Sequence, residues 1–275
     1  MRLLSAKLIG RILNTLSWTS PKTSAKLAIK LFSTPRRTKL KESENDFLST
    51  AYREDIKYED LNIMTYRWIG KKETILLAHG WESNAYRWRP LIKELSDRDY
   101  SIVALDAPAH GNTNGKSFNA ILYSECIHAV AKKFETNIVI GHSVGGMATA
   151  FFYSKYKLPH VNKLVLLGAP SNFVGVFQRY RDMMGYNERL AIAMNQFIRN
   201  KYNNSPEYYN AARFLSDTTI DGLIIHDEHD NIIPYNDAED FKNFYKKAKL
   251  ITTEGYGHGL KSDEINKHII EFINA

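Results

Sequence analysis

The sequence predicts an α/β protein built on a mostly parallel, doubly wound β-sheet. After residue 70 the chain alternates short, wholly apolar runs with longer segments that have helical spacing. Runs this short and continuous are typical of strands buried on both faces, and the intervening helices then cover the sheet. The length of 275 residues is also sufficient for one large domain with a substantial core.

In chain order, the first predicted element is a basic helical arm over residues 1–46. Its first helix has an apolar face, which consists of Leu4, Leu8, Ile9, Ile12, Leu13 and Leu16. The opposite face carries Lys7, Arg11 and Asn14. Residues three and four apart share one face of a helix, so this spacing predicts an amphipathic helix.

A second helix of the arm is predicted to begin at Ser20-Pro21, which is typical of an N-cap followed by a first-turn proline. Its inward-facing residues are predicted to be Ala25, Ala28, Ile29 and Phe32. Its outward-facing residues are predicted to be Lys22, Lys26 and Lys30. Thr34-Pro35 ends this helix.

The positive charge of the chain is concentrated in this arm. Residues 1–41 contain ten Lys and Arg and no Asp or Glu, whereas the other 234 residues have a net charge of −3 within a total of +7. Two interpretations stay open: a helical hairpin packed on the domain with solvated lysines, or a basic amphipathic surface that contacts anionic lipid. Nucleic acid is not expected as a partner, because no aromatic stacking residues alternate with the basic ones.

Targeting and membrane-spanning segments are not expected. Lys7 and Arg11 interrupt the first apolar run before it reaches the length of a signal peptide, and no stretch approaches the roughly 18 apolar residues of a transmembrane helix. The single cysteine, Cys126, excludes an intrachain disulfide and a Cys-based zinc site. We therefore expect a cytoplasmic protein that can associate with a membrane through residues 1–41.

The body of the chain, residues 47–275, is predicted to begin with an antiparallel hairpin formed by residues 51–59 and 61–69. Six apolar strands are predicted to follow: Thr74–Ala78, Ser101–Leu105, Ile138–Ile140, Leu164–Leu167, Leu223–Ile225 and Lys249–Thr252. Helical spacing occupies residues 85–95, 119–134, 145–157 and 236–247. In such sheets the ligand binds outside the carboxyl ends of the strands, so the residues that follow each strand are the candidates for function.

One connection, residues 171–220, is too long for a simple crossover. It contains two or three helical patterns and is rich in tyrosine, methionine and phenylalanine. An insertion at the carboxyl edge of a sheet is typical of a cap over the site, and a plain surface helix pair is the alternative. Within this predicted cap, Met183 and Tyr186 are expected to line a substrate pocket.

The strongest local motif is Gly-His-Ser-Val-Gly at residues 141–145, which follows an apolar strand and precedes a helix. This is the G-x-S-x-G pattern in the strand, sharp turn and helix that it requires. A serine raised on a strained turn brings neighbouring backbones close, and side chains at Gly141 or Gly145 would collide with them. Ser143 is therefore the candidate nucleophile.

A serine hydroxyl is a weak nucleophile unless a base takes its proton and a carboxylate orients that base. His258 lies in a glycine-containing loop after the last strand, and Asp230 follows the strand Leu223–Ile225. The order serine, aspartate, histidine along the chain is the one expected of a hydrolase with this motif. Asp227 follows the same strand as Asp230 and stays open as the alternative acid.

An oxyanion hole needs two backbone N–H groups aimed at the developing negative charge. Trp81, after the first buried strand, and Val144, at the start of a helix, are the candidates. The substrate pocket is predicted to include His79, Gly80, Trp81 and His142, together with Met183 and Tyr186. No metal site is expected, because His226 and His229 would point to opposite faces of an extended strand.

Five segments resemble those of the α/β-hydrolase superfamily: His79–Trp81, Asp106–Gly111, Gly141–Gly146, Asp230–Pro234 and Gly257–His258. The resemblance covers about residues 47–275 and leaves the arm, residues 1–46, outside. It implies an eight-stranded sheet, a cap inserted after the sixth strand, and no cofactor. It also implies that Ser143, Asp230 and His258 are nucleophile, acid and base.

Together these residues predict a serine hydrolase that cleaves a carboxylic ester or thioester of a small molecule through an acyl-enzyme, with carboxylesterase as the simplest activity. The same triad serves thioesterases, C–C hydrolases, acyltransferases and some peptidases, and the fold does not choose among them. A non-catalytic scaffold that binds a membrane or a partner protein is the alternative from another class.

Overall fold

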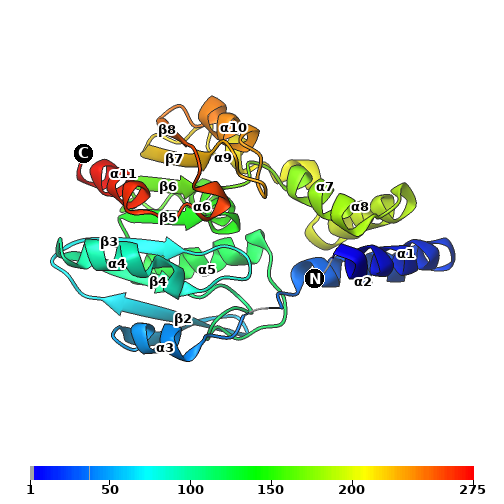
Figure 1. Ribbon diagram of the computed structural model, residues 1–275, viewed down its shortest axis with the longest axis horizontal. Helices are drawn as coiled ribbons and strands as arrows, with labels where there is room; N and C mark the ends of the chain where they lie inside the picture. The colour runs from blue at the N-terminus through cyan, green and yellow to red at the C-terminus, as the bar shows by residue number, and fades with distance from the viewer. Residues whose placement is uncertain (1–2, 37) are drawn as a thin grey trace. The chain divides into compact units, whose positions relative to one another are not determined.

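The computed structural model describes residues 3–36 and 38–275, and these divide into two compact units (Figure 1). The helical unit consists of residues 3–34 together with Asn172–Asn210. The sheet unit consists of the other described residues, up to Ser171 and from Ala211 to Ala275. In this division the N-terminal helices up to Thr34 group with the insertion Asn172–Asn210. The arm 1–46 and the cap 171–220 remain predictions.

The sheet unit is built on eight strands in the order β1-β2-β4-β3-β5-β6-β7-β8. β1 pairs antiparallel with β2 and β2 with β4, and every other pair is parallel. The strands are β1 Tyr52–Tyr58, β2 Leu61–Trp68, β3 Lys72–Ala78, β4 Tyr100–Leu105, β5 Ile138–His142, β6 Lys163–Leu167, β7 Asp221–Asp227 and β8 Ala248–Thr253. The mostly parallel sheet with an opening antiparallel hairpin is confirmed.

Helices cover both faces of this sheet (Figure 1). One face is covered by α3 Glu42–Leu48, η1 Ala85–Trp88, α4 Arg89–Ser96 and α11 Asp263–Asn274. The other is covered by α5 Ala120–Lys133, α6 Val144–Tyr156, α9 Ala211–Phe214 and α10 Asn236–Phe244. Successive strand residues point to opposite faces, so Ile75 and Leu77 pack with the first set while Leu76 is buried on the other side.

The helical unit contains α1 Leu3–Thr19, α2 Pro21–Ser33, α7 Phe173–Met184, α8 Glu188–Tyr202 and the short η2 Pro206–Tyr208. α1 and α2 pack against each other, α1 contacts α7, and both contact α8. The buried core of this unit comprises Ala6, Leu13, Ala25, Ala28, Phe177, Met184, Tyr186, Leu190, Met194 and Ile198. The second helix begins at Pro21 and buries Ala25 and Ala28, as its spacing predicts.

The face that α1 buries matches the predicted apolar face in part. Leu13 is buried, and Ile9 and Leu16 pack against the same core. Leu4, Leu8 and Ile12 are exposed instead, and the small residues Ala6 and Gly10 face inward. A Cβ added to Gly10 would lie 1.8 Å from the carbonyl oxygen of Met184. The helices therefore approach too closely for large side chains at this point, and small inner residues allow the contact.

Asn14 also departs from its predicted place on the outer polar face. Its side-chain amide donates a hydrogen bond to the carbonyl oxygen of Gly185 at 2.8 Å, and its side-chain oxygen accepts one from the N–H of Asn187 at 2.9 Å. These bonds satisfy the backbone of the turn between α7 and α8. Among the described residues, no helix combines the length and apolar character that crossing a bilayer requires.

Candidate active site

Ser143 stands on a sharp turn between β5 and α6. Its backbone has φ 55° and ψ −128°, a strained conformation for a residue with a side chain. A Cβ at Gly141 would lie 2.5 Å from the carbonyl oxygen of Gly145, and one at Gly145 would lie 2.4 Å from that of Ala78. Only glycine fits at these two positions, as the motif predicts.

His258 contacts both other residues of the predicted triad. Its Nε2 lies 3.0 Å from the Ser143 Oγ, and its Nδ1 lies 2.7 Å from the Asp230 Oδ2. A carboxylate only accepts hydrogen bonds, so Nδ1 donates to Asp230 and Nε2 is then free to accept the serine proton. The three side chains come from a turn after β5, a loop after β7 and the η3 segment Gly257–Gly259 after β8.

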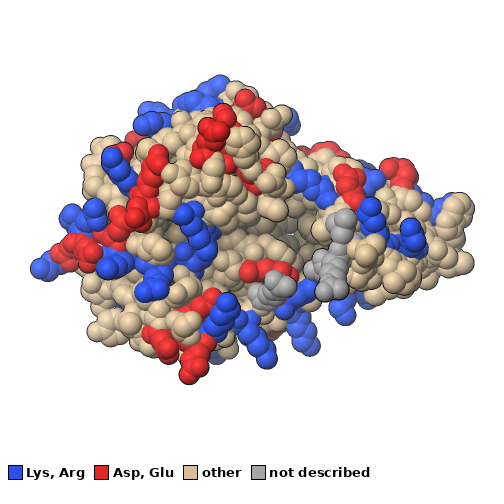
Figure 2. Space-filling model, viewed as in Figure 1, with Lys and Arg blue, Asp and Glu red and all other residues tan. Residues whose placement is uncertain are grey.

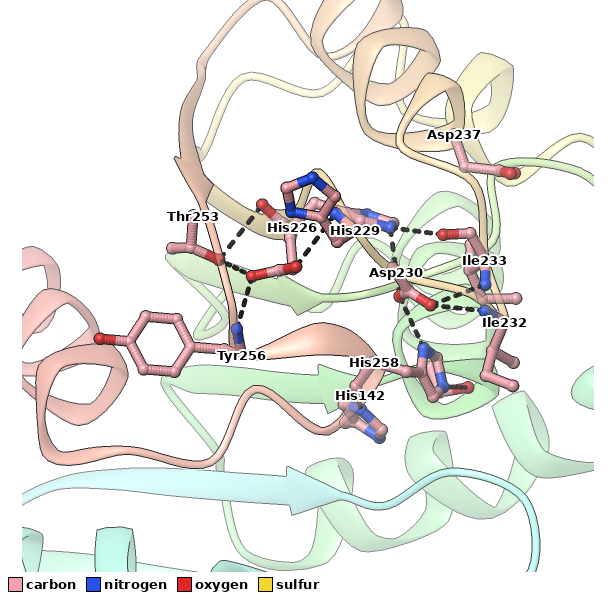
Figure 3. Close-up of polar contacts among 12 residues, drawn as sticks. His142, His226, His229, Asp230, Ile232, Ile233, Asp237, Thr253, Tyr256 and His258 are labelled. Carbon is pink, nitrogen blue, oxygen red and sulfur yellow. Dashed lines mark hydrogen bonds and ion pairs between the residues drawn. The ribbon is translucent and has the colours of Figure 1, made fainter.

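The carboxylate of Asp230 accepts several hydrogen bonds (Figure 3). Its side chain is fully buried, and its Oδ1 accepts hydrogen bonds from the N–H groups of Ile232 at 2.8 Å and Ile233 at 2.9 Å. Burial by itself would raise the pKa of Asp230, but hydrogen bonds from His226, His258 and these backbone groups outweigh it and hold the pKa well below its ordinary value.

Asp227, the alternative acid, accepts its hydrogen bonds from groups other than His258. Its Oδ2 accepts a hydrogen bond from the N–H of Tyr256 at 2.8 Å and one from the Thr253 hydroxyl at 3.1 Å, while its Oδ1 accepts from the N–H of His229. Figure 3 shows this second network beside the first. Asp227 therefore ties β7 to the segment after β8, two residues before His258, and the geometry favours Asp230 as the triad acid.

His226 also contacts the Asp230 carboxylate, a role that its position in the sequence did not suggest. Its Nε2 lies 2.9 Å from the carbonyl oxygen of Ile233, so this nitrogen carries the proton, and the same atom lies 3.4 Å from the Asp230 Oδ2. His226 is fully buried at the end of β7. A buried histidine four residues before a candidate acid is the signal that could have identified it.

Val144 and Trp81 remain the predicted oxyanion donors. Val144 is the first residue of α6, where the N–H groups lack intrahelical acceptors and the helix dipole favours negative charge. Trp81 follows β3, and its indole packs against His110 and Phe118 with ring centroids 5.7 and 5.5 Å apart. Neither backbone N–H has an acceptor within the part of the chain that the structure describes.

Two buried histidines fix the loop that carries Trp81. His79 accepts a hydrogen bond from the N–H of Ala107 at its Nε2 and donates from its Nδ1 to the carbonyl oxygen of Gly80. His110 accepts one from the N–H of Glu82 at 3.0 Å. Burial lowers the pKa of His79 well below its ordinary value and also lowers that of His110, so both are neutral and keep these tautomers.

Asp106 fixes the other end of this loop. Its Oδ1 accepts a hydrogen bond from the N–H of Ala85, and its Oδ2 accepts from the Tyr66 hydroxyl and the N–H of Asn112. Asp106 is fully buried at the end of β4. Neither Asp106 nor Tyr66 was predicted as a site residue; an aspartate directly after a buried strand was the available signal.

The predicted pocket residues divide between the two units. Gly80 lies against the nucleophile, because a Cβ there would be 2.8 Å from that of Ser143. Tyr186 is 8% exposed in the core of the helical unit, and Met183 is 42% exposed on α7. Both remain predictions as pocket residues. Within the described residues, no three His, Cys, Asp or Glu side chains are grouped so that they could hold a metal ion.

Comparison with known proteins identifies the family. The family described as alpha/beta hydrolase fold matches residues 73–190, and the one described as TAP-like protein matches residues 198–275. The chain is 20% identical to the AB hydrolase superfamily protein YisY of Bacillus subtilis over 80% of this chain and 98% of that protein. It is 23% identical to the bifunctional esterase/perhydrolase DCH of Acinetobacter calcoaceticus over 73% of this chain and 91% of that protein.

A solved structure agrees in fold. An esterase from Exiguobacterium antarcticum superposes with a TM-score of 0.63 at 17% identity, over 82% of this chain and all of that one. The eight-stranded sheet, the serine turn after β5 and these matches lead to one conclusion: the chain belongs to the α/β-hydrolase superfamily.

Proposed function

We propose that this protein is a serine hydrolase that cleaves carboxylic esters through an acyl-enzyme. The observation that carries the proposal is the position of His258, whose two ring nitrogens lie within hydrogen-bond distance of the Ser143 hydroxyl and the Asp230 carboxylate. A base that touches both a nucleophile and an orienting carboxylate is the arrangement that serine acyl transfer requires.

In the first half of the reaction the Ser143 Oγ attacks the ester carbonyl carbon and its proton passes to the His258 Nε2. The N–H groups of Val144 and Trp81 then donate to the oxyanion of the tetrahedral intermediate. Collapse of the intermediate breaks the bond to the alcohol oxygen, which takes the proton from His258 and leaves. Asp230 remains ionised and stabilises the protonated imidazole.

In the second half water replaces the alcohol. His258 takes a proton from the water as its oxygen attacks the acyl carbon, and the same two N–H groups stabilise the second oxyanion. Collapse returns the proton to the Ser143 Oγ and releases a carboxylic acid. Hydrolysis is complete without any group beyond these side chains and backbone donors.

Ester cleavage is chosen over other acyl transfers because two of the related proteins are described as esterases, one of them as an esterase and perhydrolase. The same steps would cleave a thioester, and a panel of acyl esters and thioesters of increasing chain length separates the two substrate classes. The cytoplasmic location remains a prediction.

Hydrolysis of p-nitrophenyl esters by the full chain tests the proposal. Ser143→Ala should abolish turnover and leave the circular dichroism spectrum unchanged. Ser49→Ala removes a hydroxyl at the exposed end of α3 and is the matched control, with turnover as in the wild type. Turnover retained by Ser143→Ala would overturn the proposal and would leave the non-catalytic scaffold as the better account.

A further inference from the structure

The positive charge of the chain belongs to the helical unit. By sequence, residues 1–34 and 172–210 contain eleven Lys and Arg and three Asp and Glu, a net charge of +8, whereas the rest contains 26 basic and 27 acidic residues. Figure 2 shows basic side chains on this unit among broad uncharged areas. Its exposed basic residues in the described part of the chain are Lys7, Arg11, Lys22, Lys26, Lys30, Arg189, Arg199 and Lys201. Arg2 lies outside the described residues.

Exposed apolar side chains are concentrated in the same unit. It holds 73 of the 275 residues but nine of the twelve large hydrophobic side chains that are exposed in the described chain. These nine are Leu4, Leu8, Ile12, Trp18, Leu27, Val174, Met183, Ile192 and Tyr208. A soluble surface normally scatters such residues singly, so this concentration marks an interaction surface.

The outer face of α1 combines both properties. Leu4, Leu8 and Ile12 follow one another by one helical turn and are 85%, 59% and 59% exposed. Lys7 and Arg11 are exposed three residues after Leu4 and Leu8, so each neighbours an apolar residue on the helix surface. This face therefore offers both exposed apolar area and positive charge, the two contributions that bind a helix to an anionic membrane interface.

The surface continues from α1 onto α8. The Arg189 guanidinium lies over the Trp18 ring, 4.2 Å from its centroid, and Ile192 follows one turn later with 61% exposure. Arg189 and Ile192 also line a groove of about 890 Å³ between α2 and α8. The other residues that line it are Pro21, Lys22, Glu188, Ala193, Gln196, Phe197, Asn200 and Lys201. All residues that line the groove belong to the helical unit, and none of them is a candidate catalytic residue.

We propose that this docking surface, formed by the outer face of α1 and the adjoining Trp18–Ile192 region, binds the surface of an anionic lipid bilayer. Leu4, Leu8 and Ile12 enter the boundary between headgroups and acyl chains, where tryptophan also prefers to lie. Lys7 and Arg11 then contact the lipid phosphates, and each basic side chain near an anionic surface adds to the attraction.

The positive charge of the helical unit favours an anionic bilayer over a second copy of this chain as the partner of the docking surface. Two copies that met through this surface would bring together two units of +8, and like charges repel across the contact. An anionic bilayer offers the opposite charge and an apolar layer beneath it, so both features of the surface are matched.

Flotation of the full-length protein with vesicles tests the proposal. Vesicles of phosphatidylglycerol and phosphatidylcholine in equal amounts should carry the protein, and pure phosphatidylcholine vesicles should carry little. Leu8→Gln/Ile12→Gln and Lys7→Glu/Arg11→Glu should each lower the partition coefficient by about tenfold or more. High salt should weaken binding of the wild type, because the charges are exposed.

Two control variants match these changes on the sheet unit. Lys246→Glu/Lys247→Glu makes the same change in net charge at two exposed lysines, and Tyr52→Gln/Ile69→Gln removes two exposed apolar side chains. Both controls should float as the wild type does. If Lys246→Glu/Lys247→Glu loses binding as strongly as Lys7→Glu/Arg11→Glu, attraction by overall charge alone would replace the proposed surface. An equal loss in Tyr52→Gln/Ile69→Gln and Leu8→Gln/Ile12→Gln would also overturn it, because the apolar contact would not be specific to α1.

The inference stands independently of the catalytic proposal, so Ser143→Ala should float as the wild type does. Sedimentation equilibrium without lipid should give a monomer for the wild type and all variants. Failure of the wild type to float with anionic vesicles would overturn the proposal. A dimer that Leu8→Gln/Ile12→Gln dissociates would identify a second copy as the occupant instead.

Discussion

The Nε2 of His142 donates a hydrogen bond to the carbonyl oxygen of His258, 2.8 Å away. Burial lowers the pKa of His142 well below its ordinary value, so the ring is neutral and acts here as a donor from one nitrogen. The residue directly before the candidate nucleophile therefore fixes the loop that carries the candidate base. His142 is a positioning residue in this account, whereas its sequence position predicted only a pocket wall.

Replacing His142 tests this role. His142→Phe removes the donor to the partly buried carbonyl oxygen of His258, which costs about 1 kcal/mol of stability and allows His258 to shift. We expect kcat to fall by about tenfold or more while KM changes little. His142→Gln keeps an N–H donor and should recover part of kcat. If kcat fell equally in His142→Phe and His142→Gln, the hydrogen bond from His142 to the His258 carbonyl would not be the cause of the loss.

The two aspartates after β7 form a matched pair for testing the acid. Asp230→Asn should lower kcat by about 10³- to 10⁴-fold, because the amide favours the wrong tautomer of His258. Asp227→Asn keeps an oxygen that can accept from the N–H of Tyr256, so its effect on kcat should stay within about tenfold. Steady-state kinetics of both variants decide between them, and a larger loss in Asp227→Asn would reverse the assignment.

Gly10 tests the close packing of α1 against α7. Alanine is the better helix former by about 1 kcal/mol, yet its Cβ would lie 1.8 Å from the Met184 carbonyl oxygen. We expect Gly10→Ala to destabilise the helical unit by about 1–3 kcal/mol and to speed proteolysis within α1. Thr15→Ala, at an exposed position on the same helix, is the control and should not speed it. Unchanged proteolysis of Gly10→Ala would contradict the packing.

Folding stability should fall as the pH drops below 6.5. His79, His110 and His142 have lowered pKa values in the folded protein, so below 6.5 the unfolded chain binds protons that the folded chain does not. Each histidine then removes about 1.4 kcal/mol of stability per pH unit until its folded pKa is reached. Urea unfolding at pH 7.5 and 5.5 measures the loss. His142→Gln should reduce the dependence of the unfolding free energy on pH. A urea midpoint that is the same at both pH values would contradict the prediction.

The strands and the motif were predictable because each rests on local sequence. The apolar runs 74–78 and 101–105 lie within β3 and β4, since strands buried on both faces need uninterrupted apolar residues. The serine turn was predictable because Gly141 and Gly145 have no room for a side chain. The helices α3 and α11 lie outside the predicted set.

What failed depended on tertiary contacts. The spacing of α1 predicts an apolar face but not which part of it is covered, so Leu13 is buried while Leu4, Leu8 and Ile12 are exposed. The close approach of the Met184 carbonyl oxygen leaves room only for a small residue at Gly10. The contact between His226 and Asp230 likewise depends on the path of the loop after β7, which brings Asp230 and Ile233 close to His226. The hydrophobic periodicity of one segment does not indicate which distant residues will pack against it.

The most direct test of the central claim is the site at which a fluorophosphonate reacts. The account predicts one phosphonyl group per chain, located on Ser143 by peptide mass spectrometry, and much slower labelling in His258→Ala. An adduct on another residue, or none on Ser143 in the folded wild-type protein, would contradict it.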